Sequence, residues 1–398
     1  MKLTAARLVE ACSDDSVEGG LCIKANLQPL GGPGSPVKPA VYEGGKYQQD
    51  RRWVGIGAEA SAVDAVVVDN VPSQANRLEA ALDRHRKVLG LPSIVIDLSE
   101  WTTLPPHLPR QLSSFRLPHR QADAYLRDAT LDGVPFAKAP VGAALFNGTA
   151  DRPEALVQWF PQTLLYGFWQ SHLGNKRSQA KLARSWVSEI TGLEPATVDT
   201  RIFGAKGDPL NLSISEKVSY DENDEVGIPW QLTDEKKSAV ARGQKKQDSL
   251  SNVGHGQAIF DGAPAAISFH SIQQQATLSL ASLRRIWFGD AATNAAGRGV
   301  VAALGIVAHA AAFGGAFNLR SGCDLRTTAA TWTWLGGSTD EEVEPITLEA
   351  ATHLFQECVS QAERSGLPVG SKWQTEPLIL KPNPELEKVI RRSWPVDN

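Results

Sequence analysis

An apolar run followed by an amphipathic stretch is the clearest hydrophobic pattern in this chain. Residues 63–68 read Val-Asp-Ala-Val-Val-Val, a short run rich in β-branched residues that is typical of a strand covered on both faces. Asn70 or Ser73 can cap the helix that follows, and Pro72 suits its first turn. Apolar residues then recur at helical spacing, at Ala75, Leu78, Leu82 and Leu89. The pattern therefore predicts a strand, a turn and a helix in residues 63–89.

The start of this helix carries the polar side chains of Gln74, Asn76 and Arg77. They lie beside backbone N–H groups that have no partner inside the helix, at the positive end of the helix dipole. This setting suits an anion such as a phosphate. A solvated helix start without a ligand is the alternative interpretation, because most capped helices bind nothing.

The same patterns predict further elements along the chain. Strands are expected over residues 20–27, 92–98, 266–272, 317–325, 330–335 and 377–380, and helices over 3–12, 118–128, 276–288, 298–313 and 347–365. Three stretches rich in Gly, Pro or polar residues interrupt these elements, at 31–58, 100–117 and 200–262. We interpret these three stretches as insertions.

Charge changes this picture more than overall composition does. Hydrophobic residues make up 42% and charged residues 21% of the 398 positions, which excludes a disordered or fibrous protein. The net charge of −4 argues against a general polyanion binder, but the signs are segregated. Basic residues gather at 110–127, 176–184 and 284–285, and acidic residues at 221–225 and 340–344. A surface with opposite patches can also bind copies of itself.

The cysteines and the N-terminus indicate a reducing compartment. Cys12, Cys22, Cys323 and Cys358 lie far apart and form no CxxC pair, so the spacing favours neither a zinc site nor a disulfide framework. The first residues lack the apolar core of a signal peptide, and no run approaches the roughly 20 apolar residues of a membrane span. We therefore expect a soluble cytoplasmic protein with no membrane partner.

Catalytic motifs are absent from the sequence. It contains no HExxH, GxSxG, Walker or Rossmann fingerprint, and its eight His residues show no metal-ligand spacing. Asp97, Asp208, Asp261 and Asp324 are candidate metal ligands only if the fold gathers them, since such residues more often cap helices or form turns. We therefore expect no catalytic residue, no metal and no cofactor.

Eight short stretches spread over most of the chain carry a resemblance to a known family. They are residues 27–34, 73–79, 118–124, 165–169, 187–190, 208–210, 280–285 and 319–325, of which Ser-Gln-Ala-Asn-Arg at 73–77 and Leu-Arg-Ser-Gly-Cys-Asp-Leu at 319–325 are the most specific. Together they resemble the backbone subunit of type I-U (also called I-G) CRISPR surveillance complexes of the Cascade kind. That subunit belongs to the repeat-associated mysterious protein (RAMP) superfamily.

The resemblance implies an α+β fold, a modified RRM-like or ferredoxin-like palm with inserted thumb and finger segments, in one elaborated domain over residues 1–398. It also implies that many copies stack as a helical filament along one guide RNA (crRNA), together with other subunits of the complex. The target DNA strand is then recognised by pairing with the guide, and the protein holds the guide through its backbone.

Charge and position select the residues that we expect to contact the guide. They are Gln74, Asn76 and Arg77 at the helix start, Lys176 and Arg177 in the basic stretch, then Arg284, Arg285 and Arg320, followed by Arg51, Arg52, His119 and Arg120. Two alternatives stay open. One is a metal-dependent ribonuclease that processes precursor guide RNA with some of Asp97, Asp208 and Asp324, and the other is a structural protein that binds only proteins.

Overall fold

The computed structural model describes residues 1–100, 104, 106–170, 180–196, 265–374 and 376–393. It also describes five short strands between residues 205 and 259, which are β13 (Ala205–Lys206), β14 (Lys217–Tyr220), β15 (Gln231–Leu232), β16 (Lys246–Ser249) and β17 (Ala258–Ile259). Most of the predicted 200–262 insertion lies outside the described residues, and this part includes Asp208 and Asp261. Lys176 and Arg177 of the predicted site also lie outside them.

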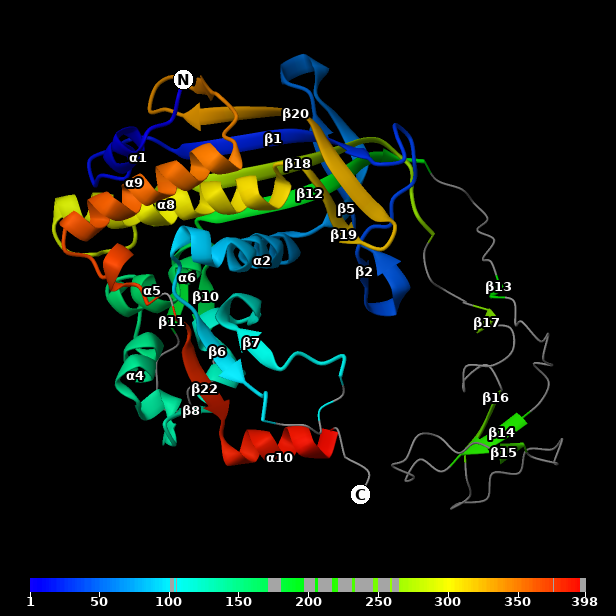
Figure 1. Cartoon of the computed structure of the whole chain (residues 1–398). Coiled ribbons are helices and arrows are strands. Elements are labelled where there is room, and N and C mark those ends of the chain that lie inside the picture. Colours follow the sequence, from blue (N-terminus) through cyan, green and yellow to red (C-terminus); the bar gives the residue numbers. More distant parts are fainter. Residues whose placement is uncertain are drawn as a thin grey trace.

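The largest element is an eight-stranded antiparallel sheet in the order β19-β20-β1-β18-β12-β5-β4, with β21 beside β20 (Figure 1). Its strands are β1 (Gly20–Pro29), β4 (Gln49–Val54), β5 (Ser61–Asp69), β12 (Trp186–Pro195), β18 (Phe269–Ser279), β19 (Ala316–Arg320), β20 (Cys323–Leu335) and β21 (Glu341–Val343). In β1 and β18, buried and exposed residues alternate, as expected for a sheet with one covered face.

Two helices complete the central unit of the sheet. Helix α2 (Val71–Leu89) lies between β1 and β12 in the chain, and α8 (Ala291–Phe313) lies between β18 and β20. The two helices pack on each other on one side of the sheet (Figure 1). The chain therefore runs β1-α2-β12-β18-α8-β20, the βαββαβ order of a ferredoxin-like unit, with the hairpin β4–β5 inserted before α2. The α+β class is confirmed, whereas the relation to RNA-recognition domains stays a prediction.

Helix α8 forms the centre of the core. It is buried almost without a break from Asn294 to Ala310, and α1 (Ala5–Ala11), α6 (Pro161–Tyr166) and α9 (Leu348–Arg364) pack around it together with α2. Contrary to the sequence expectation, α8 is long and apolar enough to cross a membrane, with a mean hydropathy of 1.5. However, 89% of its most apolar window is buried inside the protein, as in the core helix of a globular domain.

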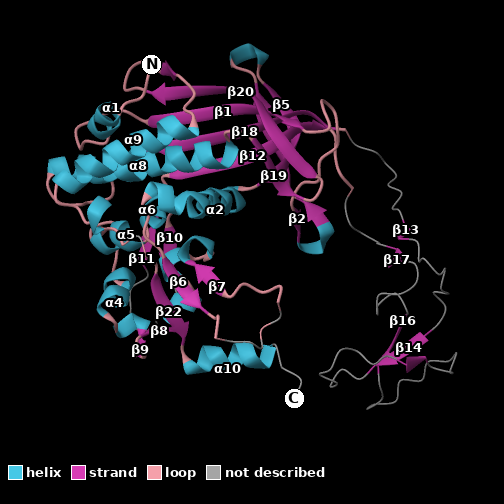
Figure 2. Ribbon diagram, in the orientation of Figure 1, coloured by secondary structure: helices cyan, strands magenta, loops and turns pink. Residues whose placement is uncertain are grey.

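A second layer lies on the far side of these helices from the large sheet (Figure 2). Its five-stranded sheet has the order β7-β6-β22-β8-β9, in which β6 and β22 pair in parallel. The elements are β6 (Ile94–Asp97), β7 (Gln111–Ser113), β8 (Ala129–Leu131), β9 (Val134–Pro135), β22 (Leu378–Pro382), α3 (Ala124–Arg127), α4 (Pro140–Phe146), α5 (Glu154–Trp159) and α10 (Pro384–Ser393). Two hairpins stand apart, β2–β3 (Val41–Tyr42 and Lys46–Tyr47) and β10–β11 (Phe168–Gln170 and Ala180–Leu182).

The strand, turn and helix predicted for residues 63–89 are confirmed. Asn70 is the N-cap of α2 and accepts a hydrogen bond from the backbone N–H of Ser73, and Pro72 lies in the first turn. Gly90 ends the helix in the left-handed conformation. The predicted apolar face is buried as Ala75, Leu78, Leu82 and Leu89.

Two predictions near the C-terminal half were wrong. The helix expected from residue 276 begins only at α7 (Leu280–Leu283), because Ala276 and Leu278 continue the two-residue alternation of β18. The strands predicted at 317–325 and 330–335 are not separated at 326–329, since β20 runs without a break over 13 residues. The chain turns instead at Gly322, whose φ of +75° favours glycine.

The helix predicted over residues 118–128 is interrupted. A single 3₁₀ turn, Arg120–Ala122, is followed by the one-turn helix α3. Arg120 has a φ of +54°, which an α-helix does not allow, and the side chain of Asp123 caps α3 from within the predicted helix. The insertion predicted at 31–58 contains β4, which is the outer strand of the large sheet.

Candidate nucleic-acid interface

One buried carboxylate gathers three of the predicted site residues. Asp69, the last residue of β5, accepts hydrogen bonds from Ser73 Oγ at 2.9 Å and from Gln74 Nε2 at 2.5 Å. It also accepts from Arg77 Nε at 2.8 Å and from Arg320 Nη2 at 2.6 Å. We call these five residues the Asp69 clamp. It joins the start of α2 to β19, although Arg320 lies about 250 residues away in sequence.

The clamp holds two guanidinium groups against one carboxylate, so it carries an excess positive charge. The Asp69 side chain is fully buried, whereas those of Arg77 and Arg320 keep 26% and 23% of their surface exposed. Backbone carbonyls fix both arginines further, because Arg77 donates to Leu319 O at 2.7 Å and Arg320 donates to Val68 O at 2.9 Å. A ligand at this point meets rigidly held cations at a helix N-terminus.

Gln74 and Asn76 take opposite positions at this helix start. Gln74 is fully buried, and its Oε1 accepts hydrogen bonds from Ser188 Oγ and Gln274 Nε2, both at 2.9 Å. Its side chain therefore attaches α2 to β12 and β18 and is not available on the surface. Asn76 is exposed.

A groove of about 390 Å³ continues from the clamp along α2. Arg77, Arg84 and Asn318 provide its polar side chains. Its remaining lining is mostly small or apolar: Ala80, Ala311, Ala312, Phe313, Ala316, Phe317 and Leu319. Small residues let a ligand backbone approach closely, and Arg77 and Arg84 add cationic groups to the same groove.

The face of the large sheet that the helices do not cover carries polar side chains in register. Lys24 on β1 pairs with Gln275 on β18, which pairs with Glu189 on β12. One step along the strands, Asn26 pairs with Gln273. The residues next to this row, such as Ile23 on β1 and its partner Ala276 on β18, are buried in the core with α8. The alternation therefore places these polar rows together on the open face.

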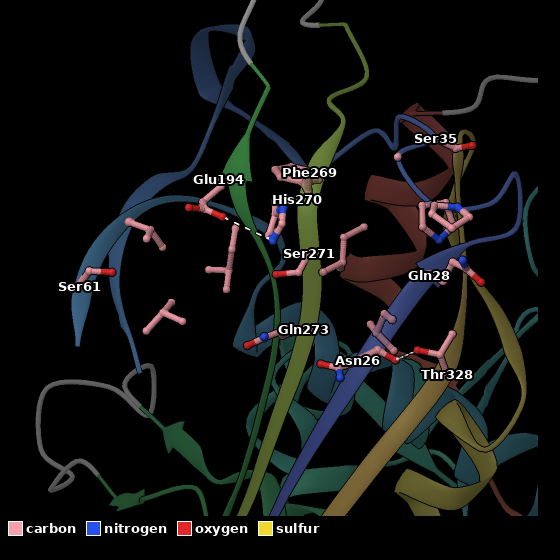
Figure 3. Close-up of a pocket in the computed structure, with 18 residues that line it drawn as sticks. Asn26, Gln28, Ser35, Ser61, Glu194, Phe269, His270, Ser271, Gln273 and Thr328 are labelled. Atoms are coloured by element: carbon pink, nitrogen blue, oxygen red, sulfur yellow. Dashed lines mark hydrogen bonds and ion pairs between the residues drawn. The ribbon is translucent and has the colours of Figure 1, made fainter. Parts of the chain in front are cut away.

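Two depressions, of about 540 and 570 Å³, follow this open face and share four residues, Asn26, Val54, Leu193 and Gln273. We call the combined surface the amide trough. Figure 3 shows its end near Asn26, Gln28 and Gln273, beside Thr328 and His270. His270 Nε2 lies 3.9 Å from Glu194, and Thr328 donates to Asn26 O at 3.1 Å. Side-chain amides are both donors and acceptors, which suits sugar hydroxyls and phosphate oxygens.

The trough differs from an RNA-recognition domain that stacks bases. Such domains carry aromatic side chains on their central strands. Here the exposed positions of β1 and β18 are Lys24, Asn26, His270, Gln273 and Gln275, so His270 at one end of the trough is the one aromatic ring among them, and Trp53 is exposed on the rim. The surface is therefore suited to hydrogen bonding along a backbone more than to stacking.

The arginines of β4 form ion pairs at the edge of the trough. Arg52 donates to Glu189 at 2.8 Å and also lies 2.8 Å from Asp50. Arg51 lies 3.4 Å from Asp64, with both side chains largely exposed. Only Arg52 lines the trough, so the structure places these two predicted residues differently.

The other predicted residues lie elsewhere. Arg284 donates to Glu18 O at 2.8 Å beside α1, and Arg285 next to it is exposed. The 23 residues of α8 separate this pair from Arg320, a distance of roughly 35 Å along the helix. Arg120 and His119 lie near hairpin β10–β11, at a third place.

Arg120 is a buried ion-pair partner. Its Nε and Nη2 lie 2.8 and 3.0 Å from the two carboxylate oxygens of Glu79, and Nη1 donates to Gly167 O at 3.1 Å. Burial raises the pKa of Glu79 to about 7, although the positive charge of Arg120 acts in the opposite direction. The main role of Arg120 is thus to connect Glu79 on α2 to Gly167 in the loop before β10.

The comparison with protein families gives a match within the part of the chain that forms these surfaces. Residues 21–196 match the family described as CRISPR-associated protein GSU0053. The match supports a CRISPR-associated protein with a role in CRISPR defence. No curated protein matches the chain.

The CRISPR-associated match begins in β1 and ends just after β12. It therefore includes Asp69, Gln74 and Arg77 of the clamp and Lys24 and Asn26 of the trough. Arg320 and the β18 residues of the trough lie outside it. The match agrees with the family resemblance of the sequence motifs at the level of CRISPR association.

The described residues provide no support for a metal site. They contain no group of three or more His, Cys, Asp or Glu side chains that could hold an ion. Asp97 lies on β6 of the small sheet and Asp324 on β20 of the large one. The described part of the chain therefore contains no carboxylate cluster of the kind that the ribonuclease alternative needs.

The sequence carries a signal for the amide trough that lies outside the eight stretches of the family resemblance. Residues 273–275 read Gln-Gln-Gln, and Lys24 and Asn26 alternate with apolar residues. We predicted a strand with one buried face over 20–27, but a sequence does not show which strands lie beside it. Only the register of β1 with β18 gathers these amides on one face.

Proposed function

We propose that this chain is a non-catalytic guide-RNA-binding subunit that forms the backbone of a type I-U or I-G CRISPR surveillance complex. Many copies stack along one guide, and the guide pairs with the target DNA strand. Other subunits complete the particle, which works in the cytoplasm. The protein belongs to the RAMP superfamily in this proposal, and its palm is the βαββαβ unit.

The single observation that carries the proposal is the amide trough on the open face of a βαββαβ sheet, in a chain that matches a CRISPR-associated family. A subunit that serves every guide sequence needs contacts to phosphates and 2′-hydroxyls and few contacts to base edges. Neutral amides with Lys24 meet that need. The Asp69 clamp and its groove supply fixed cations on the neighbouring edge.

Segregated charge supports stacking of copies. Asp340, Glu341, Glu342 and Glu344 are exposed on and around β21, at one side of the large sheet. Basic side chains, including Arg84 and Lys87, are exposed on α2. A head-to-tail contact between unlike surfaces generates a helical filament when its rotation does not close a ring.

The test is the salt dependence of binding to single-stranded RNA. We expect Lys24→Ala to reduce the slope of log affinity against log salt by about 1, because one phosphate contact is lost. The double variant Gln273→Ala and Gln275→Ala should weaken binding about tenfold with little change in slope, since amides are neutral. Gln356→Ala, on an exposed position of α9, is the matched control.

Equal affinity of the trough variants and the Gln356→Ala control would contradict the proposal. Arg285→Ala is a separate measurement in the same assay, because Arg285 is exposed and lines neither depression of the trough. An unchanged slope for Arg285→Ala removes this residue from the interface and leaves the trough as the binding surface.

A further inference from the structure

A second cavity, of about 670 Å³, lies between the 3₁₀ turn at Arg120, α3 and the hairpin β10–β11. Its lining shares no residue with the amide trough or with the groove along α2. Four of its lining residues carry basic side chains: His119, Arg120, Arg127 and Arg184. Among the described residues that line it, none is acidic.

Two buried polar groups in this lining have no hydrogen-bond partner among the residues that the structure describes. Tyr166 is 1% exposed and Gln170 is 3% exposed, yet the hydroxyl of Tyr166 and both amide atoms of Gln170 are unpaired. Leaving such groups without partners is unfavourable, and native proteins do so rarely. These atoms are shielded from solvent, so a ligand with a donor and an acceptor on one edge would satisfy them once the two side chains turn toward the cavity.

The guanidinium groups in the cavity are only partly compensated. The carboxylate of Glu79 is held by Arg120, and Arg127 pairs with its neighbour Asp128. Partial burial, followed by the positive charge of Arg120, lowers the pKa of Arg184 from its ordinary value. A bound anion would relieve this repulsion between like charges.

The backbone at Arg120 keeps this arrangement in place. Its φ of +54° is uncommon for a residue with a side chain, and such conformations cluster at functional sites. The conformation aims the guanidinium over the ring of Tyr166, 5.5 Å from its centroid. The buried ion pair with Glu79 and the hydrogen bond to Gly167 O stabilise it.

Aromatic side chains complete the lining. Phe146, Tyr166, Phe168 and Trp169 all contribute, and Trp169 is 59% exposed. The lining thus combines aromatic rings, an unpaired amide and phenol, and guanidinium groups. A nucleotide has a flat base with donors and acceptors on its edge and a phosphate at a fixed distance from it.

We propose that this cavity binds one nucleotide, with its base at Gln170 and Tyr166 among the aromatic rings and its phosphate at Arg184 and Arg127. This inference goes beyond the proposed function, because a free nucleotide and a nucleotide within an RNA share the recognised chemistry. It does not depend on the amide trough.

The test is calorimetric titration of the full-length protein with adenosine, guanosine, cytidine and uridine monophosphates, with the nucleosides and with inorganic phosphate. At least one monophosphate should bind, at least tenfold more tightly than its nucleoside and than phosphate. Arg184→Ala should weaken that binding about tenfold. Arg116→Ala, an exposed arginine outside the lining, should leave it unchanged.

The variants Tyr166→Phe and Gln170→Leu give the sharpest readout. Each removes a buried polar group that has no partner, so the thermal midpoint should stay the same or rise. Each should nevertheless weaken nucleotide binding about tenfold, because the ligand loses a hydrogen bond. A group with only a structural role would not combine retained stability with lost binding.

The source of the nucleotide is tested by competition with short RNA oligomers. Competition that requires a 5′-phosphate indicates an RNA end, competition without that requirement indicates an internal nucleotide, and no competition indicates a free nucleotide. Each of these outcomes supports the cavity as a nucleotide site.

Absence of binding by every monophosphate at millimolar concentration, or phosphate binding as tight as nucleotide binding, overturns the inference. Failure of the proposed function is distinguishable from this failure. Gln273→Ala changes the trough and should leave nucleotide binding in the cavity unchanged. In the reverse measurement, RNA binding at the trough is compared between the unchanged protein and the cavity variant Arg184→Ala.

Discussion

Asp69 and its two arginine partners stabilise one another at the end of β5. The carboxylate has no exposed surface and accepts hydrogen bonds from both guanidinium groups. Its loss would leave Arg77 and Arg320 facing each other without an anion. Removing one partner of a buried ion pair is far more costly than the net contribution of the pair.

Asp69→Asn should therefore lower the free energy of unfolding by about 3 kcal/mol, measured by urea denaturation. Asp64→Asn is the matched control on the same strand, because Asp64 also pairs with an arginine but is largely exposed. It should change stability by less than about 1 kcal/mol. Equal effects of the two substitutions would contradict this description of the clamp.

His309 is a buried titratable residue in an aromatic environment. Its ring centroid lies 5.7 Å from Trp186, 5.5 Å from Phe313 and 5.6 Å from Trp332, and burial lowers its pKa to about 4. In the unfolded chain the pKa of histidine is about 6.5. Between these values the unfolded chain binds a proton that the folded protein does not, so stability is lost as the pH falls.

We expect this residue to contribute roughly 3 kcal/mol of stability at neutral pH that is lost between about pH 6.5 and 4. His309→Phe should abolish that contribution. The measurement is the difference between the unfolding free energies of the two proteins as a function of pH. Taking this difference cancels the contribution of Glu79, which both proteins contain. The pKa of Glu79 is raised to about 7, so its own effect is that stability falls as the pH rises toward 7. A difference that does not vary with pH would refute the assignment.

At the scale of elements, α8 packs closely because its contact face is built from small residues. A Cβ atom at Gly305 would lie 2.5 Å from Cε3 of Trp186 and 3.2 Å from Cδ1 of Leu165. The glycine therefore lets the helix approach β12 and α6. Glycine costs about 1 kcal/mol of helix propensity relative to alanine, which this approach offsets.

Gly305→Ala should destabilise the protein by about 1–2 kcal/mol despite the better helix propensity of alanine, because overpacking dominates. Gly315→Ala, just after the same helix, should be close to neutral, since a Cβ there meets nothing within 4 Å. Thermal unfolding of the two variants decides this. A more stable Gly305→Ala protein would show that the helix can shift at little cost.

Sequence patterns predicted elements well where local signals agreed. The cap at Asn70 and the apolar face of α2 were both readable from residues 63–89, and α9 was predicted within a residue or two of its ends. The error at residue 276 has a physical cause. Ala276, Leu280 and Leu283 satisfy helical spacing, but pairing of β18 with both β1 and β12 keeps the chain extended to Ser279.

At the scale of the whole molecule, the candidate surfaces depend on contacts that sequence alone does not reveal. Gln74, Arg77 and Arg320 were predicted as surface contacts from charge and position. The structure brings them together, yet on Asp69, which was not among the predicted site residues. Gln74 is buried, and the amides of the trough were not among the predicted residues.

The large sheet thus presents three distinct surfaces. Its open face carries the amide trough, its edge near β19 carries the Asp69 clamp and groove, and its opposite side rests on α8 and α2 (Figure 1). The open face leaves a polar path across β1, β18 and β12, as a subunit that follows an extended RNA backbone requires.

The most direct test of the central proposal is to express this chain with its neighbouring subunits and a CRISPR array, purify the product, and sequence the nucleic acid that accompanies it. We predict a large particle that contains spacer-bearing RNA of uniform length. The double variant Gln273→Ala and Gln275→Ala should recover less of this RNA than Gln356→Ala. A monomer free of nucleic acid under these conditions would contradict a guide-binding backbone subunit.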